Sequence, residues 1–162
     1  MRSFTFLIVI LFFVSACQSP SQYDIVIQNG KIIDGTKKVP FIADLGINAD
    51  TIAFIGKIEN FKAEKIIDAT NFTISPGFID PHTHALNDLS DSLKKSNLNF
   101  LLQGVTTVLT GSDGNSVVNI GERLKEWETN GIGTNAAIMV GHRTIRKTVM
   151  SMRDEEPTEE EM

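Results

Sequence analysis

The chain has 162 residues, which is enough for one ordinary domain or for part of a larger protein. Apolar residues make up 41% and charged residues 22%, close to the globular average, which excludes a wholly disordered chain. The formal net charge is −5, with 15 basic and 20 acidic residues, so a strongly basic nucleic-acid binder is excluded as well. Residues 153–162 hold six acids and one base, so this tail alone accounts for the net charge.

The N-terminus has the pattern of a secretion signal. Arg2 precedes an apolar run over residues 4–14, interrupted only by Thr5. As a helix this run would span about 17 Å, against about 30 Å for the hydrocarbon core of a bilayer. The run is therefore too short to cross a membrane comfortably and matches the apolar region of a signal peptide.

Val14-Ser15-Ala16-Cys17 follows this run and resembles a bacterial lipobox, in which the cysteine becomes the lipidated first residue of the mature protein. We therefore expect a signal peptide over 1–16, lipidation of Cys17 and a polar tether over 17–22. This predicts secretion across the bacterial inner membrane and a periplasmic or outer-membrane lipoprotein. The alternative is a plain signal peptide with an incidental cysteine.

Residues 23–71 predict a small β-sandwich module of antiparallel strands. Short β-branched runs are separated by turn residues, and Asn29-Gly30 is expected to turn between the first two of them. The expected strands are residues 23–27, 31–33, 41–47, 51–55 and 65–68.

Residues 72–162 change to an alternation of strands and helices. The expected elements are a strand at 78–80, a helix at 93–102, a strand at 105–109, a helix at 117–127 and a strand at 136–140. This order is typical of an α/β fold with a parallel sheet and crossover helices. The acidic stretch from Glu122 to Glu128 is interpreted as the solvated face of a helix.

A His-x-His pair follows the first strand of this region. Residues i and i+2 of extended backbone point to the same side, so His82 and His84 can aim both imidazoles at one point. Two converging neutral imidazoles are typical of a site for a first-row metal ion, most often zinc. The alternative is a pair of exposed loop histidines.

At these residues the sequence resembles a known family. The stretch from Ser75 to His84, Ser-Pro-Gly-Phe-Ile-Asp-Pro-His-Thr-His, looks like the first barrel strand of the amidohydrolase superfamily. Within it, the chain is most similar to the N-acyl-D-amino-acid deacylases, or D-aminoacylases. The segments that carry this narrower resemblance are residues 103–108, 111–114, 140–146 and 157–162.

The resemblance implies the N-terminal part of a (β/α)₈ metal-dependent hydrolase barrel that follows a small β-sandwich module. It also implies one or two divalent ions, zinc above all, and hydrolysis of a small N-acyl amino acid. An aspartate after the last barrel strand would serve as general base, and we expect it beyond Met162. About three βα units fit into residues 72–162, so we expect an incomplete barrel and an inactive fragment. The capping box from Thr158 to Glu161 predicts a further helix.

Three departures from the deacylase pattern bear on the site. Asp113 stands where the deacylases have a metal-binding cysteine, so we expect it to be a ligand, with an ordinary turn aspartate as the alternative. Ala85 replaces a frequent acid, for which Asp88 could substitute. Arg143 stands where glycine is common, and could pair with a substrate carboxylate.

Two further residues complete the expected site. His142, after the third strand of the region, is expected to face the substrate together with Arg143. Asp80 is expected to orient a ligating imidazole from behind. Two other functions remain open at this point: a dihydroorotase-like cyclic amidase, and a non-catalytic lipid-anchored module that binds a metal ion or a partner.

Overall fold

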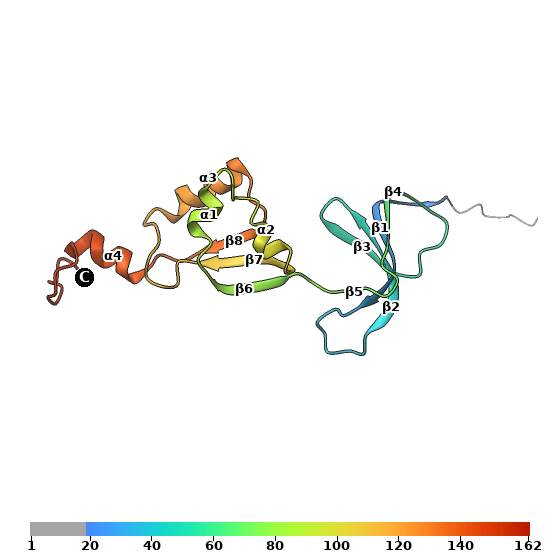
Figure 1. The fold of residues 1–162 in the computed structure, drawn as a ribbon, viewed down its shortest axis with the longest axis horizontal. Coiled ribbons are helices and arrows are strands. Elements are labelled where there is room, and N and C mark those ends of the chain that lie inside the picture. Colours follow the sequence, from blue (N-terminus) through green and yellow to red (C-terminus); the bar gives the residue numbers. More distant parts are fainter. Residues whose placement is uncertain (1–18) are drawn as a thin grey trace, which may run out of the picture. The chain divides into compact units, whose positions relative to one another are not determined.

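The computed structural model describes residues 19–162, which divide into two compact units between Ser75 and Pro76 (Figure 1). The expected signal peptide and Cys17 lie outside the described residues. The sequence placed the division four residues earlier, before Phe72. Among the helices of residues 19–162, none has the length and apolar character needed to span a membrane.

The first unit is one five-stranded sheet in the order β3-β2-β1-β4, with β5 also paired to β1. Its strands are β1 (Ser21–Ile32), β2 (Phe41–Asn48), β3 (Thr51–Gly56), β4 (Phe61–Asp68) and β5 (Thr73–Ile74). β2 runs antiparallel to β1 and β3, whereas β4 and β5 run parallel to β1. The expectation of a purely antiparallel module is therefore wrong. The sandwich itself stays a prediction.

The predicted turn at Asn29-Gly30 is a bulge inside one long strand. The pairing of β1 with β2 shifts register between Ile27 and Gly30, and Asn29 has a φ of 62°. The buried carboxylate of Asp44 accepts hydrogen bonds from the backbone N–H groups of Asn29 at 2.8 Å and Ile58 at 3.0 Å. Asp44 thus satisfies the amide that the bulge removes from the ladder, and β1 continues through it.

β1 also begins earlier than the sequence predicted. Ser21 and Gln22, expected to belong to the tether, pair with Phe61 and Lys62 of β4. The N–H of Ser21 donates a further hydrogen bond to the carbonyl of Asn60 at 3.0 Å. Only residues before Ser21 can therefore serve as a tether.

The second unit contains the predicted parallel sheet, in the order β6-β7-β8. Its elements are β6 (Phe78–Thr83), α1 (Leu86–Ser90), α2 (Leu98–Leu101), β7 (Val105–Thr110), α3 (Ile120–Asn130), β8 (Asn135–Ile138) and α4 (His142–Met150). α1 and α3 lie over the same face of the sheet (Figure 1). The α/β class is confirmed. Closure of these strands into a barrel stays a prediction.

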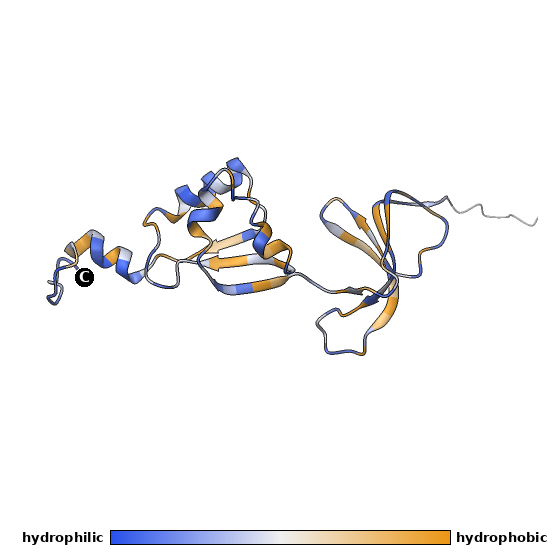
Figure 2. Ribbon diagram, viewed as in Figure 1, coloured by the Kyte–Doolittle hydropathy of each residue, from blue (hydrophilic) through white to orange (hydrophobic). Residues whose placement is uncertain are grey.

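The core of this unit forms where α1 and α3 meet β7. Ala85, Leu89, Val108 and Trp127 are almost fully buried there. The hydrophobic strands and the hydrophilic outer faces of the helices separate clearly in Figure 2. The indole N–H of Trp127 donates to the hydroxyl of Ser90 at 3.0 Å, so the one polar atom of this ring is satisfied.

The helix predicted over residues 93–102 is broken. A series of turns follows α1, and α2 begins only after Asn97, which has a φ of 52° and is 1% exposed. Its side-chain amide donates to the hydroxyl of Thr134 at 2.9 Å, just before β8. This contact, made across 37 positions of the chain, holds Asn97 in the left-handed region and ends the helical pattern.

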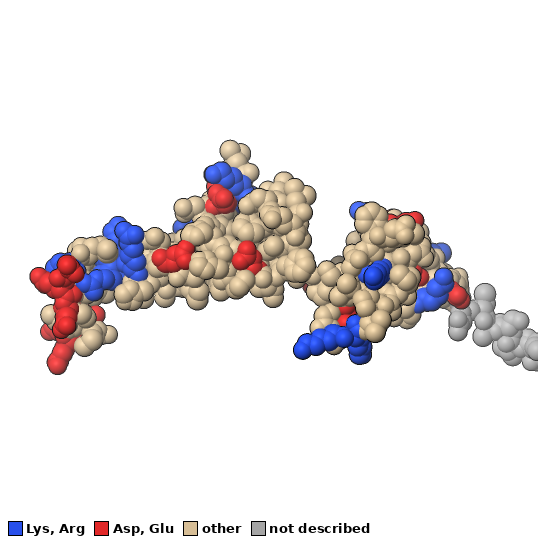
Figure 3. Space-filling view, turned by 60° about the horizontal axis from the view of Figure 1, so that its bottom comes forward, with Lys and Arg blue, Asp and Glu red and all other residues tan. Residues whose placement is uncertain are grey.

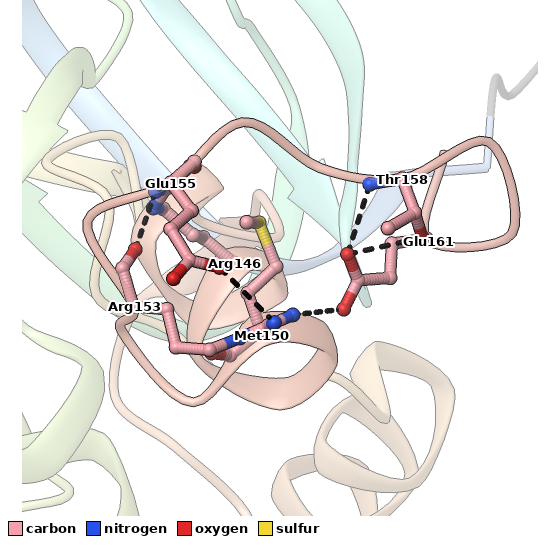
Figure 4. Close-up of polar contacts among 6 residues, drawn as sticks. All are labelled: Arg146, Met150, Arg153, Glu155, Thr158 and Glu161. Atoms are coloured by element: carbon pink, nitrogen blue, oxygen red, sulfur yellow. Dashed lines mark hydrogen bonds and ion pairs between the residues drawn. The ribbon is translucent and has the colours of Figure 1, made fainter.

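The sequence analysis did not predict α4. Figure 3 shows its basic side chains next to the acidic side chains of the C-terminal segment. The guanidinium of Arg146 donates to the carbonyls of Arg153 at 2.6 Å and Glu155 at 2.9 Å, and Arg153 pairs with the carboxylates of Glu155 and Glu161 (Figure 4). Residues 151–161 therefore fold back onto the end of α4.

The hydrogen bond of the predicted capping box is present in this segment. The carboxylate of Glu161 accepts from the backbone N–H of Thr158 at 2.9 Å and from its hydroxyl at 3.2 Å. The backbone hydrogen bond from Thr158 is the largest cause that lowers the pKa of Glu161; desolvation opposes it, and the Thr158 hydroxyl and Arg153 lower the pKa further.

Candidate metal centre

His82 lies at a bulge in the last part of β6, and not past the end of the strand as predicted. Asp80 pairs with Val108 and Thr83 with Thr110, so β6 has one residue more than β7 between these two pairs. Pro81 falls in this interval, where its missing N–H costs no ladder hydrogen bond. Thr83 is buried, and its hydroxyl donates to the carbonyl of Leu109 at 2.9 Å.

The two histidines meet one carboxylate. Nε2 of His82 lies 2.6 Å from Oδ1 of Asp113, and Nε2 of His84 lies 2.9 Å from Oδ2 of the same residue. The two imidazole rings are 6.1 Å apart, centre to centre. The structure therefore brings together the three residues that the sequence analysis expected to be metal ligands, from the ends of two adjacent strands.

Two glycines shape the turn that carries Asp113. Gly111 follows β7 directly and has a φ of +91°, and Gly114 has a φ of +86°. A Cβ on Gly111 would lie 2.2 Å from the carbonyl oxygen of Met139, at the end of β8. Only glycine fits at position 111, so the turn lies directly against the neighbouring strand and Asp113 is aimed at β6.

The donor set suits a divalent metal ion. Two imidazole nitrogens and a carboxylate oxygen are a known type of catalytic zinc site, with the fourth position left for water. The three ligand atoms lie within 4.8 Å of one another. A zinc ion with ligands at about 2.0–2.2 Å in tetrahedral geometry separates neighbouring ligand atoms by about 3.4 Å. The Nε2–Oδ distances of 2.6 and 2.9 Å are shorter than this by less than 1 Å, and they involve different oxygens of Asp113, so one shared ion also requires the imidazoles to move toward the same oxygen.

The side chains are free to make that movement. The exposed fractions are 61% for His82, 81% for His84 and 40% for Asp113. A cavity of about 460 Å³ opens beside them, lined among others by Thr110, Asn115 and Ser116. This volume lies in the usual range of small-molecule sites, and His84 and Asp113 line the cavity, so it leaves space for water or substrate next to these two residues.

Asp80 and Asp88 do not take the expected positions. Oδ1 of Asp80 accepts from the backbone N–H of His82 at 3.1 Å, so Asp80 fixes the main chain of the bulge and not an imidazole ring. Asp88 lies in the first turn of α1 and pairs with Lys94 at 3.4 Å, and Ala85 is buried in the core. Asp88 therefore does not replace the acid that is frequent at position 85 in the deacylases.

The two predicted substrate residues begin α4. His142 lines a different groove, with Ile145, Val149 and Pro157, and it does not line the cavity beside Asp113. Arg143 is exposed, and its Cβ lies 3.2 Å from the position that a Cβ on Gly114 would occupy. The backbone of Arg143 thus packs against the Asp113 turn, and its role in substrate binding stays a prediction.

The sequence analysis missed Thr144. Its backbone N–H donates to the carbonyl of Gly114 at 3.0 Å, and its hydroxyl lies 2.9 Å from the N–H of Ser116. A threonine in the first turn of a helix has no unusual local pattern. The sequence pattern that indicates α4 is the helical spacing of Ile145 and Val149. A helix predicted from this spacing would have placed Thr144 in its first turn.

No protein-family model matches the chain. The D-aminoacylase of Alcaligenes xylosoxydans xylosoxydans is 34% identical over 170 aligned positions, which cover 90% of this chain and 34% of that protein. The chain therefore spans about a third of the length of this curated relative.

Solved structures agree with the sequence match. A D-aminoacylase that defines a subset of the amidohydrolases superposes with a TM-score of 0.76 at 32% identity, over 86% of this chain and 34% of its own. An N-acyl-D-glutamate deacylase from Bordetella bronchiseptica, complexed with zinc and a phosphonate that mimics the tetrahedral intermediate, gives 0.79 at 28% identity, over 87% and 34%.

The chain is therefore similar to the D-aminoacylases, which are amidohydrolases and hydrolyse C–N bonds, and to N-acyl-D-aspartate and N-acyl-D-glutamate deacylases. A D-aminoacylase has a binuclear metal centre in which one metal activates and the second attenuates. Among residues 19–162, His82, His84 and Asp113 form the group of side chains that could hold a metal ion.

Proposed function

We propose that this chain provides the first part of the active site of a zinc-dependent deacylase that acts on N-acyl-D-amino acids. The observation that carries the proposal is the convergence of His82, His84 and Asp113, at 2.6 and 2.9 Å, beside a cavity of about 460 Å³. The relatives named above support the choice of substrate class.

The three candidate ligand residues supply different kinds of donor atom. His82, in β6, and His84, just after it, supply nitrogen donors, and Asp113, in the turn after β7, supplies a carboxylate. A divalent ion bound there lowers the pKa of a bound water and polarises a scissile carbonyl. Because the carboxylate of Asp113 presents a different oxygen to each histidine, it can also span two ions. A carboxylate is a harder ligand than a thiolate and favours ions that prefer oxygen.

A lipid anchor at Cys17 is the second part of the proposal. We infer from the apolar run at 4–14 and the small residues before Cys17 that the protein is lipidated at Cys17 and attached to a membrane. This would place the metal centre outside the inner membrane, where small N-acylated amino acids would be its substrates.

Metal content tests the site directly. The full chain is purified in mild detergent as wild type, Asp113→Ala and Ser112→Ala, equilibrated with zinc and examined by elemental analysis. We expect Asp113→Ala to lose most of its zinc, because two exposed imidazoles alone bind weakly, and Ser112→Ala to retain it. Equal zinc in the two variants would reduce Asp113 to a turn residue and remove the observation on which the proposal rests.

A substrate panel tests the activity. A protein that contains this chain together with the barrel part expected to supply the general base is loaded with zinc and assayed with N-acetyl-D-amino acids, their L-enantiomers and cyclic amides such as hydantoin and dihydroorotate. Turnover of the D-series that disappears in His82→Ala supports the proposal, whereas turnover of the cyclic amides alone favours a cyclic amidase. Zinc binding by that longer protein without turnover of any compound favours the non-catalytic, lipid-anchored module.

A further inference from the structure

Two sets of contacts hold the turn that carries Asp113, one before this residue and one after it. Its first half is fixed by backbone: the N–H of Met139 donates to the carbonyl of Thr110 at 2.9 Å, and Gly111 packs against the Met139 carbonyl. Its second half, Gly114 to Ser116, is fixed by Thr144. Asp113 lies between these two supports.

Thr144 makes every hydrogen bond that holds the second half of the turn within the described residues. Its backbone N–H donates to the carbonyl of Gly114 at 3.0 Å. Its hydroxyl oxygen accepts from the N–H of Ser116 at 2.9 Å and lies 3.2 Å from the carbonyls of both Gly114 and Ser116. One hydroxyl has one proton, so it donates to one carbonyl at a time while it accepts from the amide.

The turn has no comparable support from its own side chains. The hydroxyl of Ser116 is buried and has no hydrogen-bond partner within residues 19–162. The Asp113 carboxylate contacts only His82 and His84 among those residues. Without the Thr144 hydroxyl, the stretch after Asp113 would keep a single hydrogen bond to α4.

We propose that Thr144 is a positioning residue that holds Asp113 in place as a metal ligand and thereby couples the start of α4 to the metal centre. This inference rests on the proposed function, because it assumes that Asp113 binds the ion. Groups that orient a metal ligand from outside the coordination sphere typically contribute 10- to 100-fold to metal affinity. Since Thr144 acts on the backbone of the turn and not on the carboxylate itself, we expect the lower end, about tenfold.

Three substitutions separate this role from a general effect on α4. Thr144→Val keeps the shape and removes the hydroxyl, Thr144→Ser keeps the hydroxyl, and Thr148→Val removes a hydroxyl that bonds only to the carbonyl of Thr144 inside the helix, at 2.9 Å. Cobalt(II) affinity is measured in the full chain by competition with a chelator, and the cobalt absorption spectrum reports the ligand set. We expect about tenfold weaker binding and an altered spectrum for Thr144→Val, and values within twofold of wild type for the other two.

Hydrogen exchange of the unaltered chain provides a test that needs no variant. If α4 and the metal centre are coupled, zinc must slow amide exchange in residues 142–150 as well as in 111–116, because coupling between two sites is reciprocal. Wild-type cobalt affinity in Thr144→Val, or protection by zinc that stops at residue 116, would overturn the role of Thr144 and leave the proposed function intact. If the wild-type chain binds no cobalt, the metal site itself is wrong, and this inference with it.

Discussion

Replacing Gly111 by alanine should destabilise the second unit and weaken its metal site at the same time. A φ of +91° costs an L-residue about 1–3 kcal/mol. The new Cβ would also lie 2.2 Å from the carbonyl oxygen of Met139, so β8 or the turn has to move, at about 1–3 kcal/mol for overpacking. Together we expect a loss of about 2–6 kcal/mol in the free energy of unfolding.

Two other glycines provide matched controls. Gly131, at the end of α3, has a φ of +70° but open space around its Cα, so Gly131→Ala should cost only the backbone term of about 1–3 kcal/mol. Gly121 lies inside α3 with an ordinary φ and open space, so Gly121→Ala should stabilise by up to about 0.5–1 kcal/mol.

The assay uses the single tryptophan of the chain. Trp127 is 2% exposed in the core of the second unit, so its fluorescence during urea unfolding reports that unit alone. The expected order of stability is Gly121→Ala, wild type, Gly131→Ala, Gly111→Ala, with reduced zinc content only in the last. If Gly111→Ala is no less stable than Gly131→Ala, the close approach of the turn to β8 does not constrain the site, and the reasoning fails.

Two further predictions concern the ends of the chain. Cys17→Ser should leave the protein unlipidated and release it from the membrane fraction, and a variant that fractionates and matures like wild type would contradict the lipobox. The lowered pKa of Glu161 means that its contribution to the C-terminal fold is complete above the ordinary Glu pKa of about 4.3 and is lost as the pH falls through the lower value of the folded state. The protection of the Thr158 amide, measured relative to its intrinsic exchange rate at each pH, should therefore fall on acidification, and Glu161→Gln should show low protection at every pH; a Thr158 amide whose protection does not change with pH would refute this.

The parallel sheet could be predicted because its signals are local. Buried β-branched strands such as Val105–Thr110 and an amphipathic helix ending at Asn130-Gly131 can be recognised in any short window of sequence. The convergence of His82 and His84 was expected from extended-strand geometry, whereas Asp113 was expected only through the resemblance to the deacylases; the three meet because the carboxyl ends of adjacent parallel strands share one edge of the sheet. That these residues bind zinc stays a prediction.

The errors arose where distant contacts decide the local conformation. Asn29-Gly30 is a strong turn signal, yet Asp44 accepts the Asn29 amide and keeps β1 continuous. The leucine pattern over 93–102 is helical, yet Thr134 holds Asn97 in the left-handed region. Neither partner can be identified from the sequence near the element that it changes, because the pairs lie 15 and 37 positions apart.

α4 shows how the site depends on chain order. Each of the first two strands and the turn after it are held by the elements that follow in the chain. The hydroxyl of Thr83 in β6 donates to the carbonyl of Leu109 in β7. The turn after β7 is held by Met139, which follows β8, and by Thr144 in the first turn of α4. The ligands come from the first two strands, but the third strand and its helix are needed to place them. A chain that ended before Met139 would therefore keep all three ligands in sequence and lose the geometry that brings Asp113 to the histidines.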